Sequence, residues 1–370
     1  MYCRFENRSS QQALVFQHPV ERHAAYRAQD VDAVFAAIDA ANAKGLWVSL
    51  VLNYELGAVL LGLDTLTPTT APLITAMMFK GPTHSTPWQA PNEAVHLNCR
   101  MQHTLADYKK DIDHIRQQIR EGEYYQINHT VSIDVHSAHP PEQVYRHIAS
   151  QHPSSHAAYI VDGKRHIASF SPELFVKRQG TTLTVRPMKG TRPRFADPHE
   201  DYASGQALRN SPKDCAENIM IVDLLRNDLG QIAVPGSVQV SALLELEQYP
   251  SVWTMTSTVQ AQQQPQTSLK SLLTALFPCG SITGAPKRAA MHAIHELEQR
   301  QRGIYCGSLG WLAPNGDLNL NVAIRTLEFD GTQLGRFGVG GGIVYDSDAE
   351  QEWQECLWKA RILGTDIQLP

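Results

Sequence analysis

Hydrophobic positions repeat at two different spacings along the chain, which predicts a mixture of helices and strands. Apolar residues and helix-ending signals predict helices over residues 30–44, 104–120, 213–229, 284–301 and 347–363. Alternating or short apolar runs predict strands within 46–57, 73–79, 122–135, 156–163, 165–180, 181–187 and 304–344. Asn315-Gly316 and Asp330-Gly331 are residue pairs typical of hairpin turns, so the strand series predicts antiparallel sheets.

Helices and strands follow one another without a regular alternation, and this favours an α+β fold. No internal repeat of fixed period is present. Residues 62–98 contain five prolines among Thr and Ser, so we expect an irregular surface segment there, interrupted by the strand at 73–79.

Composition narrows the class of protein. The chain has 370 residues, 42% of them hydrophobic and 19% charged, as in a globular enzyme. A net charge of -5 argues against nucleic acid as a partner. The six cysteines show no spacing typical of a zinc site, and no apolar run reaches the ~18 residues of a membrane helix. With no leader-like N-terminus, the sequence predicts a cytoplasmic protein with reduced thiols and no membrane partner.

The predicted helix at 213–229 carries a pair of acidic residues. Ser211 is expected to cap it, and Asp214 and Glu217, three residues apart, share one face. Its apolar stripe is expected to consist of Ile219, Val222, Leu225 and Leu229. A solvated acidic face is the commoner interpretation of such a pair.

The predicted C-terminal helix also carries a pair of acidic residues on one face. Ser347 and Glu350 fit a capping box, and Glu352 and Glu355 are again three residues apart, with Lys359 one turn further on. Two such pairs could converge on one hard cation held by oxygen ligands, with Mg²⁺ favoured over Ca²⁺.

A glycine-rich segment and one arginine are candidates for binding an anion. The segment at 338–344, GVGGGIV, matches neither a dinucleotide-binding nor a phosphate-binding loop, but its amides could bind a carboxylate. Arg325 lies in an otherwise apolar strand. It either pairs with an internal acid or holds a substrate carboxylate, and the local sequence leaves both open.

Lys189 lies in the segment 186–194, RPMKGTRPR, between a proline and a Gly-Thr step. Taken alone, a lysine at the end of a strand is more often a solvated charge than a catalytic group.

Six ordered blocks resemble the signature segments of the chorismate-utilising enzymes. They are SPELF, RPMKGTRPR, SPKDCAENIMIVDLLRNDLG, FPCGSITGAPKRAAMHAIHELE, YCGSLGWLAPNGDLNLNVAIRTL and GVGGGIVYDSDAEQEWQECLWKA. The family includes anthranilate, aminodeoxychorismate, isochorismate and salicylate synthases. The resemblance implies one large α+β domain, in which antiparallel sheets form an inner core and helices pack outside. Residues 104–365 would be the chorismate-binding catalytic domain, and 1–103 a weakly matching N-terminal part of the same fold.

Within that family, a lysine in a P-[IM]-K-G-T block marks the aminodeoxychorismate synthase component I members. The resemblance therefore implies a transferase that converts chorismate and ammonia to 4-amino-4-deoxychorismate, towards 4-aminobenzoate and folate. Lys189 would add at C2 while the C4 hydroxyl leaves with help from Glu173 as general acid. The amine must be neutral, which burial or cations such as Arg186, Arg192 and Arg194 would favour. The alternative is an anthranilate synthase component I.

The resemblance also implies roles for the other candidate residues. Glu217 and Glu355 would bind Mg²⁺ directly, and Asp214 and Glu352 would act through water or from the outer shell. The substrate would be held by Thr283, Tyr305, Arg325, Gly340, Gly341, Gly342 and Lys359. Thr254 departs from the family pattern, because many members have a histidine there. No glutaminase segment is recognisable, so we expect ammonia to come from solution or from a separate glutamine amidotransferase subunit.

Overall fold

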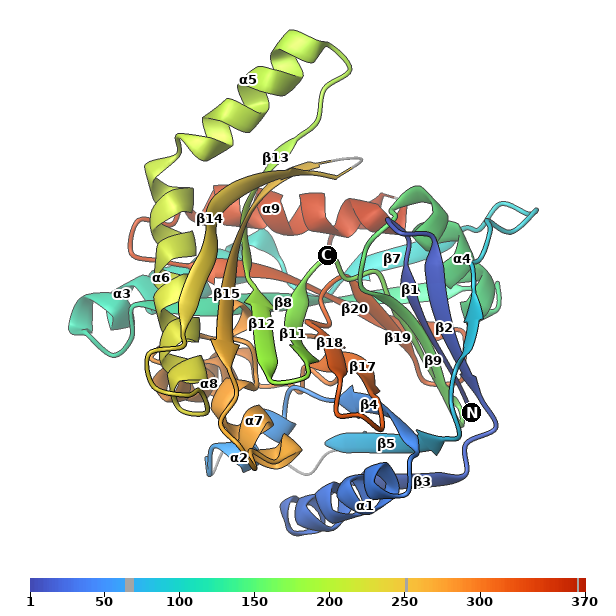
Figure 1. Cartoon of the computed structure of the whole chain (residues 1–370). Coiled ribbons are helices and arrows are strands. Elements are labelled where there is room, and N and C mark those ends of the chain that lie inside the picture. Colours follow the sequence, from blue (N-terminus) through green and yellow to red (C-terminus); the bar gives the residue numbers. More distant parts are fainter. Residues whose placement is uncertain (64–69, 250–251, 365) are drawn as a thin grey trace.

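Two large sheets pack against each other, with the helices around them (Figure 1). The computed structural model describes residues 1–63, 70–249, 252–364 and 366–370. Both of the larger buried apolar clusters contain residues from the two sheets. The predicted α+β class, with antiparallel sheets inside and helices outside, is therefore confirmed.

All strand pairs of the first sheet are antiparallel except β21 with β7. In spatial order its strands are β21 (Ile367–Gln368), β7 (Leu97–Met101), β8 (Gln126–Ser137), β20 (Leu334–Ile343), β19 (Thr326–Phe329), β10 (Arg165–Ser169), β9 (Ala157–Asp162), β1 (Tyr2–Asn7), β2 (Gln12–Gln17) and β6 (Thr83–Ser85), with β16 (Gly284–Ala285) paired to β8.

The second sheet is antiparallel throughout. In spatial order its strands are β13 (Met188–Pro193), β15 (Val252–Gln262), β12 (Thr182–Arg186), β11 (Leu174–Gln179), β18 (Leu318–Asn321), β17 (Ser308–Leu312), β4 (Trp47–Leu52), β5 (Ile74–Phe79) and β3 (Glu21–Ala25), with β14 (Gln239–Gln248) paired to β15. Residues 1–103 thus supply strands to both sheets, and the division at 103/104 stays a prediction.

The helices lie on the outer sides of the sheets. They are α1 (Val31–Ala43), α2 (Leu56–Leu60), α3 (Leu105–Glu121), α4 (Pro141–Gln151), α5 (Pro198–Arg209), α6 (Pro212–Gly230), α7 (Leu269–Leu276), α8 (Lys287–Glu298) and α9 (Ala349–Ala360), with 3-10 turns η1 (Ala28–Asp30), η2 (Gly280–Ile282) and η3 (Arg361–Leu363). Helix α9 packs on β20 and α6 on β15, whereas α5 projects from the body (Figure 1). No helix in the described ranges is long and apolar enough to cross a membrane.

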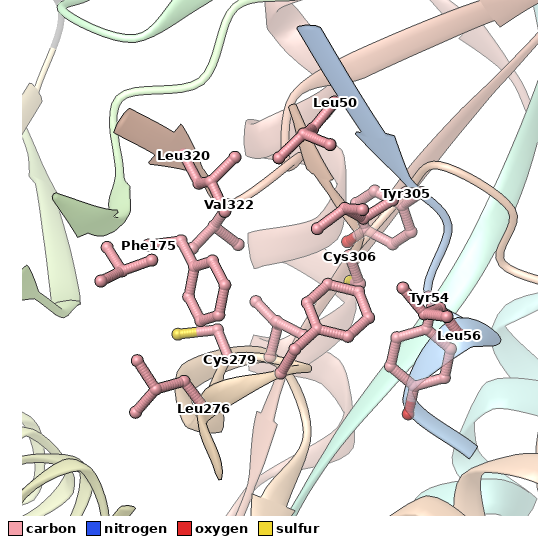
Figure 2. Packing of buried hydrophobic residues seen from close by; sticks show 14 of the residues in the cluster. Leu50, Tyr54, Leu56, Phe175, Leu276, Cys279, Tyr305, Cys306, Leu320 and Val322 are labelled. Carbon is pink, nitrogen blue, oxygen red and sulfur yellow. The ribbon is translucent and has the colours of Figure 1, made fainter. Parts of the chain in front are cut away.

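Buried aromatic and aliphatic side chains of β11, of the segment before η2 and of neighbouring strands pack together in the core. Figure 2 shows Phe175 of β11 beside Leu320 and Val322, with Cys279 close by. The rings of Phe175 and Phe277 meet edge to face, 5.9 Å between centroids. Apolar burial of this kind is the main force that holds the two sheets together. It also anchors the segment that leads into η2.

The predicted helices over 30–44, 104–120 and 213–229 are confirmed within two residues at each end as α1, α3 and α6. Ser211 caps α6 as predicted, since its hydroxyl accepts from the Asp214 amide at 3.3 Å. The predicted helix at 284–301 is shorter, because residues 284–285 form β16 and α8 begins only at Lys287.

Two local predictions are wrong. Ile219 is 42% exposed, and Ile221 takes its place in the buried stripe of α6. The N-cap of α9 is Asp348 rather than Ser347, whose hydroxyl instead donates to Glu352 at 2.8 Å. Residues 64–69 of the predicted irregular segment lie outside the described residues, and the rest of it includes β6 and the start of β7.

Candidate active site

A pocket opens between β13, β20, α6 and α9. It is lined by all the residues that the sequence singled out as site candidates except Thr283. These residues are Glu173, Lys189, Asp214, Glu217, Tyr305, Arg325, Gly340, Gly341, Gly342, Glu352, Glu355 and Lys359. Acidic, basic and glycine positions from both sheets and two helices therefore converge at one place.

A backbone irregularity directs Lys189 into this pocket. The pairing of β13 with β15 shifts register between Lys189 and Thr191, and Gly190 between them has φ +78°. Such bulges bend a strand and re-aim the adjacent side chain. A Cβ on Gly190 would lie 2.7 Å from Leu208 Cδ1, and the positive φ also favours glycine at this position. Thr254 Oγ1 donates to the Gly190 carbonyl at 3.1 Å and so braces the bulge.

The Lys189 side chain is only 11% exposed, and its Nζ lies 3.9 Å from Glu217 Oε2. A Cβ on Gly342 would lie 2.7 Å from the same Nζ, so the missing side chain at 342 makes room for the amine. The solvated-charge interpretation of Lys189 is therefore wrong.

The three neighbouring arginines do not surround this amine as expected. Each one pairs with a carboxylate of its own: Arg186 with Glu247, Arg192 with Asp214 and Arg194 with Asp201. Their charges are thereby compensated by partners of their own.

Glu173 is a buried carboxyl beside the lysine, only 3% exposed. Burial raises its pKa to about 7, although the Ser281 hydroxyl, the Lys189 charge and the Met188 amide act in the opposite direction. Ser281 Oγ donates to Glu173 Oε1 at 2.7 Å. A carboxyl with such a pKa can both give and take a proton near neutral pH.

Three glutamates of the pocket each face a lysine. The Nζ–Oε distances are 3.9 Å for Lys189–Glu217, 3.0 Å for Lys213–Glu352 and 2.6 Å for Lys359–Glu355. Burial raises the pKa of Glu217, with contributions from Glu352 and Asp214, whereas Lys359 lowers that of Glu355. The carboxylates thus repel one another across the pocket.

These carboxylates have the chemistry of a magnesium site, because hard oxygen donors are what Mg²⁺ prefers. As they are placed with their lysine partners, the described residues include no group of three acidic, His or Cys side chains close enough to hold a metal ion. To hold a cation, these carboxylate side chains would have to move closer together.

The pocket also offers groups for an anion, close to its carboxylates. The Gly340 carbonyl accepts from Lys359 Nζ at 2.6 Å. In an antiparallel strand a residue's N–H and C=O point to the same edge, so the Gly340 amide also points away from β8. Tyr305 lies against this strand, since a Cβ on Gly338 would be 2.2 Å from its Cδ1.

Arg325 does not lie within a strand as predicted. It lies in a bend just before β19 with φ +48°, and it lines the pocket. Burial lowers the pKa of its guanidinium. No acid within the described ranges forms an ion pair with it. This removes the internal-pairing alternative and leaves the guanidinium free for a ligand carboxylate.

Thr283 does not line the pocket. It is fully buried, and its hydroxyl donates to the Cys279 carbonyl at 3.0 Å. Its neighbours Ser281 and Ile282 line the pocket instead. Sequence reasoning missed Ser281, Lys213 and Asn128 as lining residues. The position of Lys213 beside Asp214 was the one available signal.

Comparisons with known proteins agree with this geometry. The family model described as chorismate binding enzyme matches residues 69–364. The chain is 40% identical over 258 residues to aminodeoxychorismate synthase component 1 of Klebsiella aerogenes, covering 70% of this chain and 57% of that protein. It is 36% identical over 266 residues to anthranilate synthase component 1 of Streptomyces coelicolor, covering 72% and 52%. The chain thus spans little more than half the length of these relatives.

A solved structure supports the fold. The crystal structure of anthranilate synthase component I from Streptococcus pneumoniae TIGR4 matches with a TM-score of 0.84 at 24% identity, covering 97% of this chain and 93% of that one. At this identity the likeness concerns the fold alone.

Proposed function

Because the chain belongs to the family of chorismate binding enzymes, we propose that it is an aminodeoxychorismate synthase component I. It would convert chorismate and ammonia to 4-amino-4-deoxychorismate, a precursor of 4-aminobenzoate and folate. The observation that carries the proposal is Lys189, which the Gly190 bulge directs into the pocket with its Nζ 3.9 Å from Glu217 Oε2. Similarity to relatives of this name supports it.

Lys189 would act as a covalent catalyst. Its neutral amine forms a bond to ring C2, both ring double bonds shift towards C4, and the C4–O bond breaks. Ammonia then forms a bond to C4, both double bonds shift back, and the C2–N bond to the lysine breaks. Two displacements replace one difficult substitution and return the free lysine.

Glu173 would carry the protons of these steps. With a pKa of about 7 it can protonate the departing C4 hydroxyl, which leaves as water. The resulting carboxylate takes the proton that the attacking lysine nitrogen loses. In the second displacement Glu173 gives this proton to the departing lysine nitrogen and takes one from the attacking ammonia. Ser281 keeps the carboxyl oriented through its 2.7 Å hydrogen bond.

The two carboxylates of chorismate would be bound on opposite sides of the pocket. The guanidinium of Arg325, which lines the pocket, can form a forked hydrogen-bonded pair with one of them. The Gly340 amide and Lys359 lie at the acidic side, near Glu352 and Glu355. Bound Mg²⁺, held by Glu217 and Glu355 with Asp214 and Glu352 further out, would neutralise the ring carboxylate.

We expect a separate glutaminase subunit to supply the ammonia, as the designation component 1 of the relatives suggests. A cytoplasmic location agrees with six cysteines that all remain unpaired.

An anthranilate synthase component I is the second candidate, because a relative of that name is 36% identical. Lys189 argues against it, since members with that activity usually lack this lysine. The deciding experiment incubates the protein with chorismate, Mg²⁺ and ammonium, and then adds aminodeoxychorismate lyase. Formation of 4-aminobenzoate only after the lyase is the expected result. Anthranilate or salicylate as product would overturn the proposal.

A further inference from the structure

We propose that Lys213 is a tethered competitor of the metal ion: its ammonium group occupies the acidic side of the pocket and must swing out when a divalent cation binds. Lys213 lies in the first turn of α6, and its Nζ is 3.0 Å from Glu352 Oε1. The inference rests on the metal site of the proposed function and deepens it.

The charges of the pocket require such an exchange. Glu217, Glu352 and Glu355 are matched one to one by Lys189, Lys213 and Lys359. A divalent cation added to this balanced set brings two uncompensated charges. Departure of one ammonium group reduces this excess of positive charge, so the cation binds more tightly when one leaves.

Among the three lysines, Lys213 is the one that can leave at low cost. Lys189 is 11% exposed, whereas the Lys213 side chain is 45% exposed. Lys359 is also bonded to the Gly340 carbonyl at 2.6 Å. Within the described part of the chain, Glu352 is the single hydrogen-bond or ion-pair partner of Lys213.

The carboxylate that Lys213 would release stays in place. Glu352 is buried, and its Oε1 also accepts from Ser347 Oγ at 2.8 Å. Removal of the Lys213 charge, whose Nζ lies 3.0 Å from Glu352 Oε1, would therefore strengthen the attraction of this carboxylate for a cation.

The test is calorimetric titration of the metal-free protein with Mg²⁺ alone. Lys213→Met should bind Mg²⁺ about tenfold more tightly, the effect of one unit charge on a dication several ångströms away in a water-like medium. Lys213→Arg keeps the charge and should not tighten binding. Lys270→Met is the matched control, because Lys270 forms an exposed pair with Asp32 on α1.

Thermal unfolding provides a second readout. The midpoint of Lys213→Met should rise more on addition of Mg²⁺ than that of the unchanged protein, and the midpoint in a chelator shows whether the variant folds. Unchanged or weaker Mg²⁺ binding by Lys213→Met overturns the inference, as does absence of binding in every variant. Weaker binding of chorismate without metal, with Mg²⁺ affinity unchanged, would make Lys213 a substrate-binding residue instead. Product formation is measured separately, so the proposed function can stand if this inference fails.

Discussion

The Ser281 hydroxyl donates a 2.7 Å hydrogen bond to Oε1 of the buried Glu173. This bond links η2 to the loop before β11 and favours the ionised carboxylate, whereas burial raises the pKa of Glu173 to about 7. The two effects together keep this carboxyl close to half-protonated at neutral pH.

Ser281→Ala is expected to raise the pKa of Glu173 further, by about one pH unit, because the ionised form loses its donor. Because kcat falls as Glu173 loses its proton, the pH at which kcat falls should rise by the same amount. The value of kcat at its optimum should fall about tenfold, because the acid is no longer held in position. Ser281→Thr should restore both. An unchanged pH profile in Ser281→Ala would contradict this role.

Gly342→Ala should abolish activity without unfolding the protein. The added Cβ would lie 2.7 Å from Lys189 Nζ and 2.1 Å from Gln126 Nε2, so both side chains must move. Gly230→Ala at the end of α6 is the matched control, since its Cβ would meet nothing within 4 Å. Circular dichroism and steady-state rates would check both variants. Full activity in Gly342→Ala would contradict the placement of the amine.

Arg325→Gln is expected to raise KM for chorismate about 10- to 100-fold, the worth of a hydrogen-bonded pair between charged groups. The reason is that the guanidinium faces the pocket without an acidic partner among the described residues. Arg336→Gln is the control, because Arg336 is exposed. If KM is unchanged in Arg325→Gln, this arginine does not bind the substrate.

Glu298 and Arg302 form a buried ion pair behind the pocket, at 2.6 Å. Burial alone would raise the pKa of Glu298, but Arg302 and Arg300 outweigh it and lower this pKa to about 2. The folded-state value is below the unfolded value of about 4.3. This group therefore contributes stability above pH ~4.3 that is lost as the pH falls towards 2.

Glu298→Gln should consequently reduce the free energy of unfolding at neutral pH by about 3–5 kcal/mol, because it leaves Arg302 buried and unpaired. The stability of this variant should depend less on pH in the acid range. Urea denaturation at several pH values would measure both effects. An unchanged acid dependence would show that the pair does not govern acid stability.

Elements with local signals could be predicted from the sequence. Helix α6 has its cap at Ser211 and a periodic apolar stripe, and β8 alternates clearly. Strands β14 and β15 were not predicted, although Trp253 to Gln262 alternate apolar and polar residues. Strand β15 pairs with β12 and β13, which lie far away in the sequence, and with β14. Helix α5 buries little beyond Leu208 against Trp253, so its pattern is too weak to detect.

Residues of the candidate site also divide into those that the sequence predicted and those that it did not. Motif positions such as Glu173, Lys189 and Arg325 were predicted to act together, and they line one pocket. The direction of a single side chain was less predictable: Thr283 turns its hydroxyl to the Cys279 carbonyl, and Ser281 points into the pocket instead. Such choices depend on the packing of η2 against β8 and α6, which the sequence alone does not reveal.

The most direct test of the central claim is the covalent intermediate on Lys189. The protein is mixed with chorismate and Mg²⁺ without any ammonia source, quenched in acid, digested and analysed by mass spectrometry. We predict that the peptide containing Lys189 carries the mass of chorismate less one water, and that added ammonium discharges it as 4-amino-4-deoxychorismate. Formation of 4-amino-4-deoxychorismate by Lys189→Ala at an undiminished rate, with no adduct on the unchanged protein, would contradict the account.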